Sequence, residues 1–269
     1  MGPIRRGPAF HHYADARTWL GIPHAGDVLS NLGFVVVAAW QLGRTRGFAR
    51  LAAAGVAAIG IGSAAYHVSS TDMTLALDWG PIAITLSWIV AAVIADRHDR
   101  RVGVVAAIVG TLLALASIAY WLATGGTSGG DMTGYVAVQA AGVALPAAIA
   151  LATPGRIPAP PLLVAIVGFG AARLCAARDG ELLATLGVSG HSLKHVVAAA
   201  AALIALRALT RFSSVGGRPV GSSGRRRGLL GGHGGHRVSD VLSCSPEGHP
   251  RTPTSVQRCP VRGAVPGHR

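Results

Sequence analysis

Residues 51–95 read LAAAGVAAIGIGSAAYHVSSTDMTLALDWGPIAITLSWIVAAVIA, and this stretch decides the fold class of the chain. Two long apolar segments, near 48–66 and 79–95, flank a polar loop that contains no arginine or lysine. A helix needs about 20 mainly apolar residues to cross the hydrocarbon core of a bilayer, and both segments approach that length. The stretch therefore predicts two antiparallel membrane helices that are joined at one face of the membrane.

The rest of the chain repeats this pattern. Of its 269 residues 51% are hydrophobic and only 13% are charged, and the mean hydropathy is +0.47. A soluble protein of this length needs more charge on its surface, and the chain is too apolar for a nucleic-acid module despite its net charge of +13. The 37 glycines and many alanines favour helices that pack closely. The predicted spans are 28–43, 48–66, 79–95, 102–123, 132–152, 160–177 and 188–209. The predicted fold is an all-α integral membrane bundle of seven helices.

Composition also divides the chain into three parts. Residues 1–26 form a predicted extracytoplasmic N-terminal segment without the apolar core of a signal peptide. Residues 27–210 form the predicted membrane domain. Residues 211–269 are rich in Gly, Ser, Pro and Arg without helical or strand periodicity, so we expect a disordered basic tail.

The arginines predict the orientation of the bundle. The loops at 67–78 and 124–131 contain no arginine or lysine, whereas the alternate loops and the region after the last span are basic. The arginines of that basic side are Arg44, Arg46, Arg50, Arg97, Arg100, Arg101, Arg156, Arg207 and Arg211. Arg5, Arg6, Arg17 and Arg178 lie on the other side and argue against this orientation. An odd number of spans together with a basic C-terminal end is the stronger evidence. The positive-inside rule then places the N-terminus outside and the C-terminus in the cytoplasm of a multi-pass cell-membrane protein.

Ionisable residues gather at one end of this predicted bundle. His67 ends span two and Asp78 lies in the first turn of span three, while His191 and His195 lie one turn apart at the start of span seven. The alternating direction of the spans brings all four residues to the same depth. Ionisable groups at membrane depth are costly, which makes this cluster the candidate functional site.

The residue types suit a catalytic zinc ion. Zinc in enzymes commonly takes three protein ligands and leaves a fourth position for water, and histidines four residues apart share one helix face. His67, His191 and His195 are the candidate ligands. Zinc makes water a nucleophile near neutral pH, and Asp78 is the candidate general base. Ser63 lies four residues before His67, so its hydroxyl could stabilise a substrate oxyanion.

Other interpretations of these residues remain open. The helical histidines could form interhelical hydrogen bonds, and Asp78 could only cap span three, since Asp is favoured at helix N-termini. Ser63 could be a small packing residue. Lys194, the only lysine in the chain, could extend to the membrane surface or face a pore.

The arrangement resembles the signature of the alkaline ceramidases: Ser63-x3-His67-x10-Asp78, then Pro81, then His191-x3-His195 in the last span. The resemblance covers residues 13–210 and includes GDVLSNLGF at the start of span one. It implies that the three histidines bind Zn²⁺, that Asp78 acts on the activated water and that Ser63 supports the site. The implied reaction cleaves a long-chain N-acyl amide such as ceramide into a fatty acid and an amino alcohol.

Two further points follow from the resemblance. Eukaryotic members have an acidic N-terminal segment that binds calcium, whereas YADARTWLGIPHAGD contains only Asp15 and Asp27, so calcium is not carried over. The superfamily also contains adiponectin and progestin receptor-like proteins and hemolysin III-like proteins, so a receptor-like or hemolysin-like role is an alternative. A metal or proton transporter is the other alternative, although the inner halves of the spans are apolar.

Overall fold

The computed structural model describes residues 2–7, 10–125 and 129–213, and within these ranges every regular element is a helix. Seven of these described segments are long and apolar enough to cross a membrane, as the sequence predicts. The helices are α1 (Ala25–Ser30), α2 (Leu32–Leu42), α3 (Gly47–Val68), α4 (Asp72–Arg97), α5 (Arg100–Ala123), α6 (Thr133–Ala152), α7 (Ala159–Ala177), α8 (Asp179–Leu186) and α9 (Gly190–Ser213).

The helices differ from the sequence-based prediction in three main features. The first span consists of α1 and α2, which meet at Asn31. The third span begins at Asp72, because Thr71 caps it by a reciprocal capping box with Thr74. The predicted loop at 67–78 is therefore wrong, and only three residues join α3 to α4. The short helix α8 precedes α9 and was not predicted.

Small residues bring α3 and α4 into close contact. A Cβ atom built on Gly62 would lie 2.0 Å from the carbonyl oxygen of Leu77, and one on Gly55 would lie 2.1 Å from Oγ1 of Thr85. Only glycine fits such approaches, which are typical of membrane helix pairs. Because Gly62 precedes Ser63 and Leu77 precedes Asp78, the closest approach of the two helices lies beside the candidate site.

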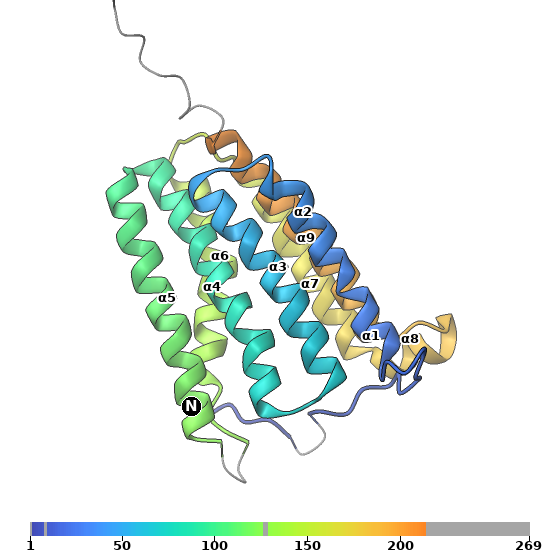
Figure 1. The fold of residues 1–269 in the computed structure, drawn as a ribbon. Helices are drawn as coiled ribbons and strands as arrows, with labels where there is room; N and C mark the ends of the chain where they lie inside the picture. The colour runs from blue at the N-terminus through green and yellow to red at the C-terminus, as the bar shows by residue number, and fades with distance from the viewer. Residues whose placement is uncertain (1, 8–9, 126–128, 214–269) are drawn as a thin grey trace, which may run out of the picture. The chain divides into compact units, whose positions relative to one another are not determined.

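The helices pack so that the first and last spans are neighbours (Figure 1). Helix α9 contacts α2, α7 and α3, while α5 lies at the edge of the bundle against α4 and α6. One end of the bundle contains the α3–α4 turn, the N-terminal segment and α8, and we call it the α3–α4 end. All predicted site residues lie near this end.

The surface of the helices suits a lipid environment. Many large apolar side chains are exposed, above all along α5, where they cover one full side of the helix. These residues are Val102, Val104, Val105, Ile108, Val109, Leu112, Leu113 and Leu115. The buried core is instead dominated by alanines and a few large residues such as Trp121 and Leu206. Bare apolar surface on this scale is typical of a membrane domain. The predicted tail, apart from residues 211–213, lies outside the described residues.

Candidate metal centre

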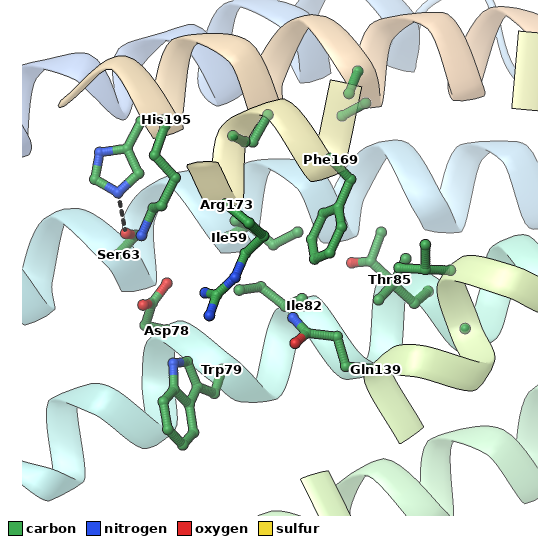
Figure 2. Close-up of a pocket in the computed structure, with 18 of the residues that line it drawn as sticks. Ile59, Ser63, Asp78, Trp79, Ile82, Thr85, Gln139, Phe169, Arg173 and His195 are labelled. Atoms are coloured by element: carbon green, nitrogen blue, oxygen red, sulfur yellow. Dashed lines mark hydrogen bonds between the residues drawn. The ribbon is translucent and has the colours of Figure 1, made fainter. Parts of the chain in front are cut away.

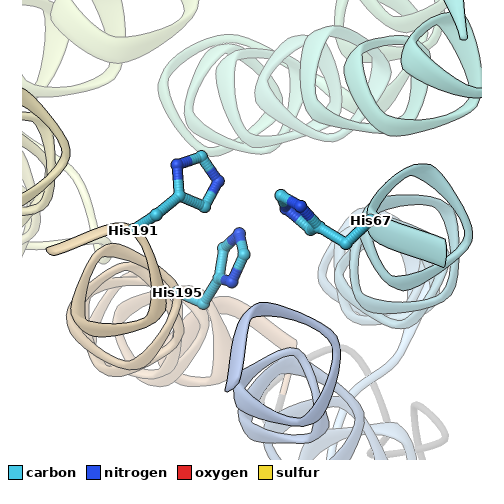
Figure 3. Close-up of side chains that lie close together, drawn as sticks. All are labelled: His67, His191 and His195. Carbon is cyan, nitrogen blue, oxygen red and sulfur yellow. The ribbon is translucent and has the colours of Figure 1, made fainter. Parts of the chain in front are cut away.

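Three histidines from two helices meet at the α3–α4 end (Figure 3). His67 lies in the last turn of α3, and His191 and His195 lie one turn apart at the start of α9. Their ring centroids are 4.8 Å (His67–His191), 5.1 Å (His67–His195) and 4.9 Å (His191–His195) apart. The rings therefore form a nearly equilateral triangle, and His67 and His195 are each only 1% exposed.

The nitrogen atoms of this triangle fit a shared metal ion. One ring nitrogen from each histidine lies within 4.8 Å of the others, and a tetrahedral zinc with bonds of about 2.0–2.1 Å requires separations of roughly 3.3 Å. Both ring nitrogens of His67 are buried without a hydrogen-bond partner. Because buried polar atoms are normally satisfied, this orphaned imidazole is itself an argument for a ligand that completes the site. The donor set of three imidazoles suits zinc.

Hydrogen bonds from α1 orient His195. The hydroxyl of Ser30 donates its proton to the backbone carbonyl of Asp27, at 2.9 Å, and Oγ of Ser30 lies 2.8 Å from Nδ1 of His195. The Ser30 hydroxyl has one proton: when this proton is on the Asp27 carbonyl, Oγ accepts from Nδ1–H of His195, and the free lone pair is on Nε2. Nε2 lies 3.4 Å from Oγ of Ser63. A histidine that donates from its second nitrogen to a fixed acceptor is the usual arrangement around protein-bound zinc.

The start of α9 is anchored by the carboxylates of Asp27 and Asp179. Oδ1 of Asp27, a fully buried residue, accepts hydrogen bonds from Ser189 at 2.8 Å and from Ser192 at 2.7 Å. Asp179 in α8 accepts a hydrogen bond from the backbone N–H of His191 at 2.9 Å. These bonds fix the helical turn that carries the two histidine ligands.

The N-terminal segment covers the histidines from the α3–α4 end. The ring of Tyr13 packs edge-on against His67 and His191, with centroid distances of 4.7 and 4.4 Å. Its hydroxyl donates to the hydroxyl of Tyr66 at 2.9 Å, and burial raises the pKa of Tyr13, so the phenol stays neutral. A second anchor is Asp15, whose carboxylate accepts hydrogen bonds from the Arg17 side chain that hold its pKa below the ordinary value.

The other face of the centre opens into a cavity of about 420 Å³ (Figure 2). Asp78, Ser63 and His195 face the same region of this cavity, and His191 also lines it. Along α9 its lining extends from His191 to Leu206, which corresponds to about 22 Å at 1.5 Å per residue. The far part is apolar, with Val56, Ile89, Leu162 and Leu206 among its walls. The cavity thus combines a polar end beside the histidines with a long apolar extension.

The structure changes the interpretation of Asp78. The sequence placed it in the first turn of span three as a possible cap, but Thr71 is the cap and Asp78 lies more than one turn inside α4. Its residue exposure is 6%, and it lines the cavity together with Ser63. The capping interpretation is therefore wrong. Asp78 is a buried carboxylate beside the candidate metal centre.

Several site residues were missed by the sequence analysis. Asp27, Ser30 and Asn31 are polar residues spaced three and four apart in an apolar span, a periodicity that indicates one buried face. Arg173 is a charged residue within the apolar span of α7, and it lines the cavity together with Lys194. Such charges at membrane depth are a recognisable signal. Tyr13 had no comparable signal, because it precedes the first span.

Comparison with protein families, with curated proteins and with solved structures finds no match to this chain.

Proposed function

We propose that this protein is a zinc-dependent membrane hydrolase of the alkaline ceramidase type, which cleaves the amide bond of a long-chain N-acyl lipid. The products would be a fatty acid and an amine, as in the hydrolysis of ceramide. The proposal includes a location in the cell membrane, with the N-terminus outside and the C-terminus in the cytoplasm, because the loops at the opposite end from the histidines hold most of the arginines.

One observation carries the proposal: three histidines, a buried carboxylate and a serine hydroxyl meet at the polar end of a long apolar cavity. An acyl chain suits the apolar extension, and its amide would then reach Asp78 and Ser63. Ligand sites of this kind are concave and mainly apolar, with a few convergent polar groups. A metal transporter would instead need polar groups along the far part of the cavity, where Ile89, Leu162 and Leu206 lie.

The residues can divide the chemistry as follows. His67, His191 and His195 would hold the ion, which supplies Lewis-acid activation of water and of the amide carbonyl. Asp78 would accept the proton of the attacking water and transfer it to the amide nitrogen as the carbon–nitrogen bond breaks. Ser63 would donate a hydrogen bond to the carbonyl oxygen as negative charge develops there. The ring of Tyr13 would exclude bulk water from the opposite face.

The purified protein in detergent tests this proposal. We expect about one zinc ion per chain, and hydrolysis of N-palmitoylsphingosine that is lost after chelation and restored by zinc. His191→Ala and His195→Ala should lose most of the metal, whereas His98→Ala is the matched control, because His98 is exposed at the opposite end of α4. Folded wild-type protein that hydrolyses the amide without any metal would contradict the zinc mechanism.

A further inference from the structure

Arg173 is a cation in the membrane domain that has no carboxylate partner. It lies one turn before the end of α7, in a helix that is otherwise apolar, and no ion pair with a described residue forms at its guanidinium. Figure 2 shows this guanidinium turned into the cavity, on the side that faces Asp78. Arg97 and Arg178, by contrast, are paired with Asp96 and Glu181. Unpaired charges at membrane depth are generally functional.

Lys194 is a second cation that lines the same cavity. It lies on α9 between two of the candidate zinc ligands, and its ammonium is 2.9 Å from Nε2 of His191. Asp78 and Arg173 both lie close enough to Lys194 to affect its charge electrostatically, and all three residues line the cavity. Since Lys194 is one turn into α9 and Arg173 one turn before the end of α7, the two cations reach the cavity from neighbouring helices.

The charges of the cavity do not balance. Asp78 is the only acidic residue of its described lining, against the two cations Arg173 and Lys194. A bound zinc ion would add further positive charge, because its three histidine ligands are neutral. The excess positive charge therefore favours an anion at this end of the cavity. A guanidinium is the side chain best suited to bind carboxylate or phosphate through two parallel hydrogen bonds.

We propose that Arg173 and Lys194 bind an acidic group of the substrate, a carboxylate or phosphate within a few bonds of the scissile amide. This inference rests on the proposed amide hydrolysis and narrows its substrate class to acidic N-acyl lipids. With the acyl chain in the apolar extension and the amide beside Asp78, the head group points towards α7. Arg173 remains exposed there, so an incoming head group can reach it.

Two palmitoyl amides of nearly equal size test the proposal. N-palmitoylglycine has a carboxylate two bonds from the amide nitrogen, whereas N-palmitoylethanolamine has a neutral hydroxyl. N-palmitoyl phosphoethanolamine is a third substrate, which tests a phosphate in place of the carboxylate. Zinc-loaded wild type should show a higher kcat/KM for the acidic amides than for the neutral one. Arg173→Gln should reduce this selectivity ratio about 10-fold or more, the usual effect of losing a charged hydrogen bond. Arg178→Gln, an exposed arginine outside the cavity, is the matched control and should keep the ratio.

The outcomes separate this inference from the proposed function. Equal hydrolysis of acidic and neutral amides, unaffected by Arg173→Gln, overturns the head-group site while the hydrolase proposal stands. A second result would also overturn the inference: palmitate inhibits Arg173→Gln less than wild type, while the selectivity ratio is unchanged. The two cations would then bind the carboxylate of the product rather than the head group of the substrate. Equilibrium binding of radiolabelled N-palmitoylglycine to the metal-free protein provides a readout without turnover. If no amide is hydrolysed but this binding weakens in Arg173→Gln, the anion site stands and the hydrolase proposal fails.

Discussion

The Nδ1 atom of His195 lies 2.8 Å from the hydroxyl oxygen of Ser30, although 165 residues separate them in the chain. When the Ser30 hydroxyl donates to the carbonyl of Asp27, its oxygen accepts from Nδ1–H of the imidazole, which then presents Nε2 to the centre of the histidine triangle. The first membrane helix thus contacts the ring nitrogen that orients a candidate metal ligand in the last one. This relationship makes Ser30 a positioning residue for the metal centre.

Replacement of Ser30 by alanine should weaken metal binding. The variant removes the acceptor that orients His195, and loss of such a partner typically costs about 10–100-fold in metal affinity. Competition with a zinc chelator measures the change. Ser117→Ala is the control, because the Ser117 hydroxyl donates to the Ala114 carbonyl of its own helix and lies outside the histidine cluster. Equal zinc affinity in both variants would show that Ser30 does not orient the ligand.

Asp78→Asn should separate catalysis from metal binding. Asn has the same shape but cannot accept a proton, so zinc and fold should be retained while amide hydrolysis falls by about 10²–10⁴-fold. Zinc content and turnover of the same preparation give the two readouts. Ser63→Ala should show a smaller loss if its hydroxyl only assists the carbonyl oxygen. Asp99→Asn is the control for a purely structural role, because Asp99 caps α5 through its carboxylate.

Two results for Asp78→Asn would contradict this division of roles. Loss of zinc as complete as in His195→Ala would identify Asp78 as a metal ligand. Hydrolysis at the wild-type rate would show that the buried carboxylate takes no part in proton transfer.

The orientation of the bundle can be measured by cysteine labelling. In a variant without the native cysteines, Ser69→Cys should react with a membrane-impermeant reagent in intact cells, because Ser69 is exposed in the α3–α4 turn on the predicted outer side. The native Cys244 and Cys259 of the tail should react only after the cells are opened. Labelling of the tail cysteines in intact cells would reverse the proposed topology.

The ion pair of Asp15 predicts a pH-dependent contribution to stability. Hydrogen bonds from Arg17 lower the pKa of Asp15 in the folded state, so its carboxylate stabilises the fold above the ordinary value of 3.8. This contribution is lost as the pH falls through the lowered pKa. Wild type should therefore unfold at a higher temperature than Asp15→Asn at pH 7, and the difference should shrink as the pH falls below 3.8 and vanish below the lowered pKa of the folded state. Both proteins should be metal-free, so that histidine protonation affects them equally. A difference that stays constant or grows as the pH is lowered from 7 through 3.8 and further into acid would show that another property of Asp15 is responsible.

The spans and the histidine cluster could be predicted because each depends on local sequence. Long apolar segments specify membrane helices whatever their neighbours are, and the i, i+4 spacing of His191 and His195 places both on one helix face. The depth of His67 then followed from the alternating direction of the helices. The start of α4 was misplaced because hydropathy reports where apolar residues begin, whereas the helix begins at the Thr71 cap.

Contacts that depend on tertiary packing could not be predicted in the same way. The bond between Ser30 and His195 requires that the first and last spans be neighbours, and nothing in either segment alone specifies that pairing. The position of Tyr13 likewise depends on how the N-terminal segment folds back over the bundle. Arg173 was visible as a charge in an apolar span, but only the cavity shows that it faces Asp78.

The buried bonds from Asp27 to Ser189 and Ser192 have a consequence for biosynthesis. The ribosome completes α1 long before α9, so the nascent chain enters the bilayer with the Asp27 carboxylate lacking its final partners. Polar groups in this situation attract helices that can satisfy them, which draws the last helix to the first. The histidine triangle is complete only after that step, because two of its three members arrive with α9. If the site holds the proposed metal, the ion can be bound only after α9 is in place, because chains that terminate before α9 lack two of the three candidate ligands.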